Sequence, residues 1–185
     1  MRVHYRLFQT WRTLTSKPQS SDLLEIKSVL SPGLYSLFIQ MHPSEQAHSI
    51  AVYKNLLSQG IQNKDLLTAA LLHDVGKNRH PIKLWERITI VLGETFLPEK
   101  AKLWSEGKPE GLKRPFVVAH RHAEWGADLA AQAGASKLTA DLIRRHQDSI
   151  QNNKGAITSD QMNSSNRDFT ETELLFLLQR SDNLY

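Results

Sequence analysis

Hydrophobic residues recur along most of the chain with the spacing of amphipathic α-helices. No segment shows the alternation of apolar and polar residues that is typical of a half-buried strand. The pattern predicts helices over residues 3–14, 22–30, 33–41, 44–58, 64–75, 81–92, 99–105, 115–133, 137–147 and 171–183. The sequence therefore predicts an all-α fold.

Local signals mark the ends of these helices. Thr170 to Glu173 reads "TETE", which is a capping box, and Gly60 and Gly134 follow expected helix ends. Prolines lie at or near expected starts or linkers: Pro18, Pro32, Pro43, Pro81, Pro98 and Pro115.

Two segments differ from the rest of the chain. Residues 1–20 form a basic N-terminal segment, and residues 148–169 are polar and rich in Asn and Ser. We expect the second segment to be a surface loop, either disordered or functional. The remaining helices, within residues 21–185, are expected to form a single domain.

The composition limits the chemistry that is available. The 185 residues are 40% hydrophobic, enough for one globular core, and they contain no cysteine. Any metal ion must therefore be held by nitrogen and oxygen atoms. The sequence contains no signal-peptide pattern and no apolar run long enough to span a membrane. We expect a cytoplasmic protein without a membrane partner.

The net charge of +4 arises at the N-terminus, from Arg2, Arg6, Arg12 and Lys17. The rest of the chain carries equal numbers of basic and acidic residues. Four charges favour a solvated helix face over a nucleic-acid contact, so we do not expect a nucleic-acid partner. RNA binding through residues 1–20 stays open as a minor hypothesis.

Several ionisable residues lie on the apolar faces of the expected helices. In "DLLTAALLHDVGK", a histidine and an aspartate end an otherwise apolar run. Burying an unpaired charge costs several kcal/mol, so such residues need partners. Four histidines and two aspartates share this position on an inward face: His48, His73, Asp74, His122, His146 and Asp182.

Taken singly, each of these six residues is explained by a hydrogen-bonded role in the core. Taken together they form a set of nitrogen and oxygen ligands, and a divalent ion would give all of them a partner. The other histidines, His4, His42, His80 and His120, are not expected to be ligands. Arg121, Arg144 and Arg145 are expected to form surface salt bridges, and Glu124 either orients a ligand or faces solvent.

The ordered set of motifs resembles the HD superfamily of metal-dependent phosphohydrolases. A histidine in an amphipathic helix precedes "HDVGK", which resembles the HDIG motif with Val75 in its third position. "HAEWGA", a histidine at the end of the next helix and an aspartate in the last helix follow in order.

The resemblance implies an HD-domain-like helical bundle with a metal site. His48, His73, Asp74 and Asp182 resemble the four defining ligands, and His122 and His146 match extra ligands of binuclear members. Asp74 would then bridge two ions and Lys77 would face the substrate phosphate, so these two are the catalytic candidates. One or two divalent ions are implied, with Mn, Fe, Mg, Co and Ni as candidates.

We therefore expect a phosphohydrolase, either a phosphomonoesterase or a phosphodiesterase, that acts on a nucleotide or another small phosphorylated substrate through metal-activated water. The Gly-Tyr-Pro signature of cyclic-dinucleotide phosphodiesterases is missing after His146, which argues against cyclic di-GMP. No Gly-rich phosphate loop or nucleophile elbow is present. The alternative is a regulatory module that binds metal and a phosphorylated ligand without turnover. The sequence indicates neither the general acid nor the oligomeric state.

Overall fold

The computed structural model describes residues 17–148 and 169–185. These residues form α-helices, short 3-10 helices and turns, and no strand occurs among them. The predicted all-α fold is therefore confirmed. The helix expected over residues 3–14, most of the basic segment 1–20 and the interior of the loop expected over residues 148–169 lie outside the described residues.

The described helices follow the expected order along the chain. The α-helices are α2 (Ser20–Val29), α3 (Pro32–Ile39), α4 (Pro43–Ser58), α5 (Lys64–Leu72), α6 (Leu84–Phe96), α7 (Pro98–Trp104), α8 (Arg114–Gln132), α9 (Lys137–Arg145) and α11 (Glu171–Asp182). Two 3-10 helices, η1 (Val75–Arg79) and η2 (Gly111–Lys113), lie before α6 and α8.

The expected start and stop signals act as predicted. Prolines stand in the first turn of α3, α4, α7 and α8, where a missing N–H leaves no hydrogen bond unmade. Thr170 and Glu173 form the capping box of α11. Gly60 and Gly134 have φ angles of 79° and 94°, the left-handed conformation that glycine adopts without strain after a helix.

Two helices differ from their predicted bounds by three residues or more. The helix expected over residues 64–75 ends at Leu72, because Asp74 leaves the helical conformation with φ −94° and ψ 0°. A 3-10 helix follows it. The helix expected over residues 81–92 begins at Leu84 and continues to Phe96. There the Glu86 carboxylate accepts from the Lys83 N–H at 2.7 Å, and Pro98 begins the next helix.

Helix α5 lies at the centre of the main hydrophobic core. Leu66, Ala69, Ala70, Leu71 and Leu72 are all fully buried. Around them pack apolar residues of α2, α3, α4, α8, α9 and α11. A helix that is apolar on every side is stable only in such a position, because each face removes apolar surface from water.

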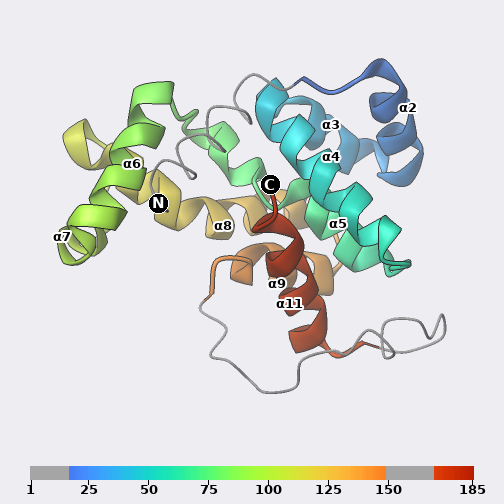
Figure 1. The fold of residues 1–185 in the computed structure, drawn as a ribbon. Coiled ribbons are helices and arrows are strands. Elements are labelled where there is room, and N and C mark those ends of the chain that lie inside the picture. The colour runs from blue at the N-terminus through green and yellow to red at the C-terminus, as the bar shows by residue number, and fades with distance from the viewer. Residues whose placement is uncertain (1–16, 149–168) are drawn as a thin grey trace.

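Figure 1 shows that α6 and α7 lie at one end of the molecule and α2 to α5 at the other, with α8 running between them. α9 and α11 lie side by side below α8 and α5, and contacts join α9 to α5, α8 and α11. The C-terminal ends of α5 and α9, the middle of α8 and the end of α11 thus approach one region.

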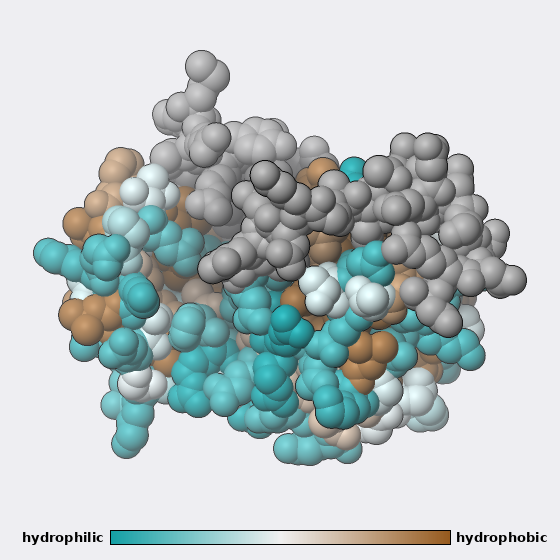
Figure 2. Space-filling model, turned by 90° about the horizontal axis from the view of Figure 1, so that it is seen from below, coloured by the Kyte–Doolittle hydropathy of each residue, from teal (hydrophilic) through white to brown (hydrophobic). Residues whose placement is uncertain are grey.

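The described surface is mostly hydrophilic on the face drawn in Figure 2, with hydrophobic groups at the end occupied by α6 and α7. Large apolar side chains on these two helices are exposed, among them Trp85 at 51% and Phe96 at 66%. No helix among the described residues combines the length and the apolar character needed to cross a bilayer.

Candidate metal centre

The six predicted ligands come together from five segments of the chain. His48 lies on α4, His122 on α8 and Asp182 on α11, and the others follow α5 and α9. Asp182 Oδ1 lies 2.8 Å from His48 Nε2 and 3.4 Å from His73 Nε2. Asp74 Oδ1 lies 3.2 Å from His122 Nε2. The ring of His146 lies 5.2 Å, between centroids, from the rings of both His73 and His122.

The chain places His73 and Asp74 at the buried C-terminal end of α5. The last carbonyls of a helix lack partners within it. The His73 ring satisfies one of them, because its Nδ1 lies 2.9 Å from Ala70 O. Asp74 O then accepts from Lys77 N at 3.0 Å, which begins η1. The motif thus ends one helix, starts the next turn and leaves the Asp74 carboxylate in the interior.

Two motif glycines let η1 approach α8 closely. A Cβ atom on Gly76 would lie 1.9 Å from His122 O and 2.6 Å from Gly126 N. A Cβ atom on Gly126 would in turn lie 3.1 Å from Gly76 N. Glycine is needed where one backbone packs directly on another. This close approach holds Asp74 near His122.

Hydrogen bonds to the backbone orient three of the histidine rings. In each, Nδ1 lies within hydrogen-bond distance of a helix carbonyl, so Nδ1 carries the proton and donates it. The distances are 2.9 Å from His73 to Ala70 O, 3.2 Å from His122 to Val118 O and 2.7 Å from His146 to Ile143 O. In the neutral form of each ring, Nε2 carries the lone pair that a metal ion binds.

His73 Nε2 provides a test of whether a cation fits here. The atom is buried, and no hydrogen bond to it is formed by any residue within 17–148 or 169–185. Two carboxylates nevertheless flank it, since Asp182 Oδ1 lies 3.4 Å away and Asp74 Oδ2 3.6 Å away. Once this nitrogen gives up its proton, its lone pair and the two carboxylates around it are donors of the kind that a divalent ion requires.

The charges of the ion-free cluster depend on one another. Burial acts to raise the pKa of Asp74, but Lys77, His73 and His122 hold it well below its usual value. Burial acts to lower the pKa of His73, but Asp74 and Asp182 raise it to about 9. Asp74 is therefore ionised at neutral pH, and in the ion-free protein a proton on His73 partly balances the two carboxylates.

For His146, the effects that lower the pKa outweigh those that raise it. Burial lowers its pKa to about 3, and the interactions with His73 and His122 act in the same direction. Its imidazole is therefore neutral near pH 7, the form that binds metal. The pKa of Asp182 lies below its usual value, because His73 and His48 outweigh the opposing effect of burial. Asp182 has the most exposed side chain of the six, at 28%, so the cluster is most open to solvent on its side.

The ligand atoms form two groups that share Asp74. His48, His73 and Asp74 make the first group, and Asp74, His122 and His146 make the second. Within each group all ligand atoms lie within 4.8 Å of one another, and Asp182 adjoins the first through His48 and His73. Each group could therefore hold a metal ion, and the Asp74 carboxylate is common to both groups.

A chain of ion pairs that the sequence analysis missed extends from Asp74. Lys77 Nζ lies 2.6 Å from Asp74 Oδ2 and 3.4 Å from Glu45 Oε2. Glu45 also pairs with Arg87. Glu45 precedes His48 by three residues and so shares its helix face, which was the one available signal. Nothing in the sequence indicated Arg87.

The other ionisable side chains that the sequence singled out lie elsewhere. His42 caps α4, with Nδ1 3.3 Å from Ser44 N, and the His80 ring lies 5.1 Å from the ring of Trp125. His4 lies outside the described residues. The expected surface salt bridges are Arg121–Glu124, Arg144–Asp128, Arg145–Asp148 and Arg145–Glu171.

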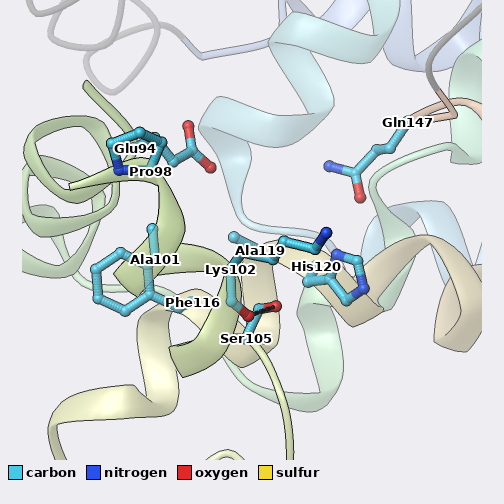
Figure 3. Close-up of a pocket in the computed structure, with 9 residues that line it drawn as sticks. All are labelled: Glu94, Pro98, Ala101, Lys102, Ser105, Phe116, Ala119, His120 and Gln147. Atoms are coloured by element: carbon cyan, nitrogen blue, oxygen red, sulfur yellow. Dashed lines mark hydrogen bonds between the residues drawn. The ribbon is translucent and has the colours of Figure 1, made fainter. Parts of the chain in front are cut away.

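A cavity of about 310 Å³ lies between α6, α7 and α8, and none of the six cluster residues lines it. In Figure 3, Lys102 and His120 lie between Pro98 on one side and Gln147 on the other. His120 stands two residues before His122, so its ring points away from the cluster.

Comparison with protein families identifies the part of the chain that carries these features. The family model of the HD domain matches residues 46–184, which include all six cluster residues and Lys77. No curated protein and no solved structure matches the chain. The HD superfamily includes metal-dependent phosphohydrolases, which accords with a buried His and Asp cluster able to hold a metal ion. By this match, the chain belongs to the HD domain family.

Proposed function

We propose that the chain is a metal-dependent phosphohydrolase that releases phosphate, or cleaves a phosphodiester, on a nucleotide or another small phosphorylated substrate. His48, His73, Asp74, His122, His146 and Asp182 would hold one or two divalent ions. The observation that carries the proposal is that the Nε2 atoms of His73 and His122 lie 3.2–3.6 Å from carboxylate oxygens of Asp74 and Asp182, within two ligand groups that share Asp74.

The chain's own residues supply distinct parts of this chemistry. When bound, divalent ions lower the pKa of a coordinated water and stabilise negative charge on a phosphoryl group. Asp74 is ionised and belongs to both ligand groups, so it would help to hold an ion in either of them. Lys77 is part-buried and offers a positive charge to a phosphate oxygen. The carbonyls that accept from the rings fix the ligands before an ion binds.

The experiment is elemental analysis of the protein as purified, joined to a phosphate-release screen with Mn, Fe, Co, Ni and Mg. We expect bound transition metal and hydrolysis of at least one phosphoester. His73→Ala combined with Asp74→Ala should lose both while the circular dichroism of the helices is kept. His120→Ala is the matched control, because this histidine lies on the same helix as His122 but outside the cluster.

Two results would contradict the proposal. Hydrolysis that is equally fast after complete removal of metal would exclude the metal mechanism. Metal-loaded protein that is stabilised by phosphorylated ligands but hydrolyses none would instead indicate a regulatory module of the same fold.

A further inference from the structure

A second, more enclosed cavity adjoins the proposed metal centre through Lys77. Its volume is about 200 Å³, and its lining residues are Gln40, His42, Glu45, Lys77, Asn78, Pro81, Ile82 and Arg87. The amino group of Lys77 lies 2.6 Å from the Asp74 carboxylate. A substrate whose phosphate contacts Lys77 at the metal centre therefore has this cavity directly beside it.

The cavity is lined by one carboxylate, Glu45, and by the two cations Lys77 and Arg87. Glu45 is only 4% exposed and is shared between Lys77 and Arg87. Lys77 has a second carboxylate partner in Asp74, at 2.6 Å, so Glu45 is the carboxylate left to Arg87. The Nε–H group of Arg87 is buried, and none of the described residues accepts a hydrogen bond from it. A buried donor without an acceptor is costly. Arg87 is among the residues that line the cavity, so a ligand that draws its guanidinium group inward and supplies an acceptor gains from binding here.

The size of the cavity limits what can occupy it. Sites for drug-sized ligands measure about 300–1,000 Å³, so a cavity of about 200 Å³ accepts a smaller group. Its walls also contain the amides of Gln40 and Asn78 and the apolar rings and chains of Pro81 and Ile82. This combination suits a compact, charged group on a short carbon chain better than a nucleoside.

We propose that Arg87 determines substrate specificity by binding a second anionic group of the substrate, a carboxylate or a phosphate. The inference rests on the proposed function, because it assumes that the first phosphate lies at the metal centre. The guanidinium group forms paired hydrogen bonds with such anions, and Glu45 holds it in place. The substrate class is then a small phosphorylated acid or a bisphosphate.

The test measures binding of two phosphonates to the full-length, metal-loaded protein by calorimetry. Phosphonoacetate carries a second anionic group, whereas ethylphosphonate lacks it. Neither compound contains a phosphoester bond, so a phosphohydrolase leaves both intact during the measurement. Wild-type protein should bind phosphonoacetate at least about tenfold more tightly, the effect of one charge-assisted hydrogen bond. Arg87→Gln should make the two affinities equal and leave that of ethylphosphonate unchanged.

Arg114→Gln is the matched control. Like Arg87, Arg114 pairs with a buried carboxylate, in this case Glu86 of α6. Arg114 is not among the residues that line the cavity. Its variant should keep the tenfold preference. Should Arg87→Gln not fold, Arg87→Lys keeps a cation beside Glu45 while losing the paired donors, and its preference should fall at least severalfold.

Three results would overturn the inference: equal affinities in the wild type, a full preference in both Arg87 variants, or the same loss in Arg114→Gln. A preference that depends on Arg87 in a protein that hydrolyses no phosphoester would support this binding role and contradict only the proposed hydrolase activity. The two proposals can therefore fail separately.

Discussion

Gly76 and His122 are in direct backbone contact: a Cβ atom on Gly76 would lie 1.9 Å from the carbonyl oxygen of His122. The contact joins the turn that carries Asp74 to the helix that carries His122. Since Asp74 Oδ1 lies 3.2 Å from His122 Nε2, any widening between η1 and α8 would also separate these two side chains. The glycine of the motif thus determines the geometry of the ligand cluster.

Gly76→Ala should therefore destabilise the protein and weaken metal binding. Added volume in a packed interior typically costs about 1–3 kcal/mol, and the contact with backbone atoms places this substitution at the upper end of that range. Gly126→Ala should cost less, because the nearest atom to its new Cβ lies at 3.1 Å. Denaturant unfolding with and without metal measures both effects. An alanine at position 76 as stable as wild type would show that the backbones separate without penalty.

Lys77→Met should lower turnover while metal binding is kept. The lysine carries the positive charge nearest Asp74, and we propose that it also contacts the phosphate. Removing such a contact should reduce kcat at least about tenfold. Lys54→Met is the control, because Lys54 forms its ion pair with Asp22 at the surface. Metal content and steady-state kinetics measure the two quantities, and an unchanged kcat would remove Lys77 from the catalytic site.

Metal affinity should rise with pH up to about 9. In the ion-free protein the pKa of His73 is raised to about 9, so at neutral pH an incoming ion must displace a proton. Above that value the displacement is no longer required. Metal titrations in buffers of different ionisation enthalpy would count the protons released. The absence of proton release near pH 7 would contradict a protonated His73.

The ion-free protein should lose stability as the pH falls below about 6.5. The pKa of His146 is lowered to about 3 in the folded state, whereas an unfolded histidine takes up a proton near its usual value of 6.5. Its contribution is fully present above 6.5 and is lost on acidification. That of His73, whose folded pKa is raised, is constant below 6.5.

Unfolding in the presence of a chelator between pH 7 and 5 checks this prediction. His146→Asn removes the titrating ring, so its stability should fall less over the same interval. Parallel curves for wild type and variant would assign the loss to other groups.

The sequence predicted correctly the features that depend on residues within a single helix. Periodicity identified the helices, and the apolar faces selected six residues that the fold brings together. The capping box at Thr170 was predicted correctly for the same reason, because a cap is a contact within a few residues.

Features that depend on the packing between helices were not predicted. The helix expected to reach Val75 ends at Leu72, because the turn at Asp74 and Gly76 is adapted to α8 rather than to its own neighbours in sequence. The pairing of Glu45 with Arg87 likewise joins residues 42 positions apart. Such contacts follow from how α4 and α6 are oriented, which a pattern along one helix does not contain.

The contact between His48 and Asp182 joins residues 134 positions apart. An ion held by both would therefore act as a removable crosslink that ties the last described helix to α4, in the way a disulfide closes a long loop. Such a link limits the freedom of the unfolded chain most when the loop is long. Loss of the ion should consequently destabilise α11 before the other helices. The amide hydrogens of α11 would then exchange faster, while those of α5 stay protected.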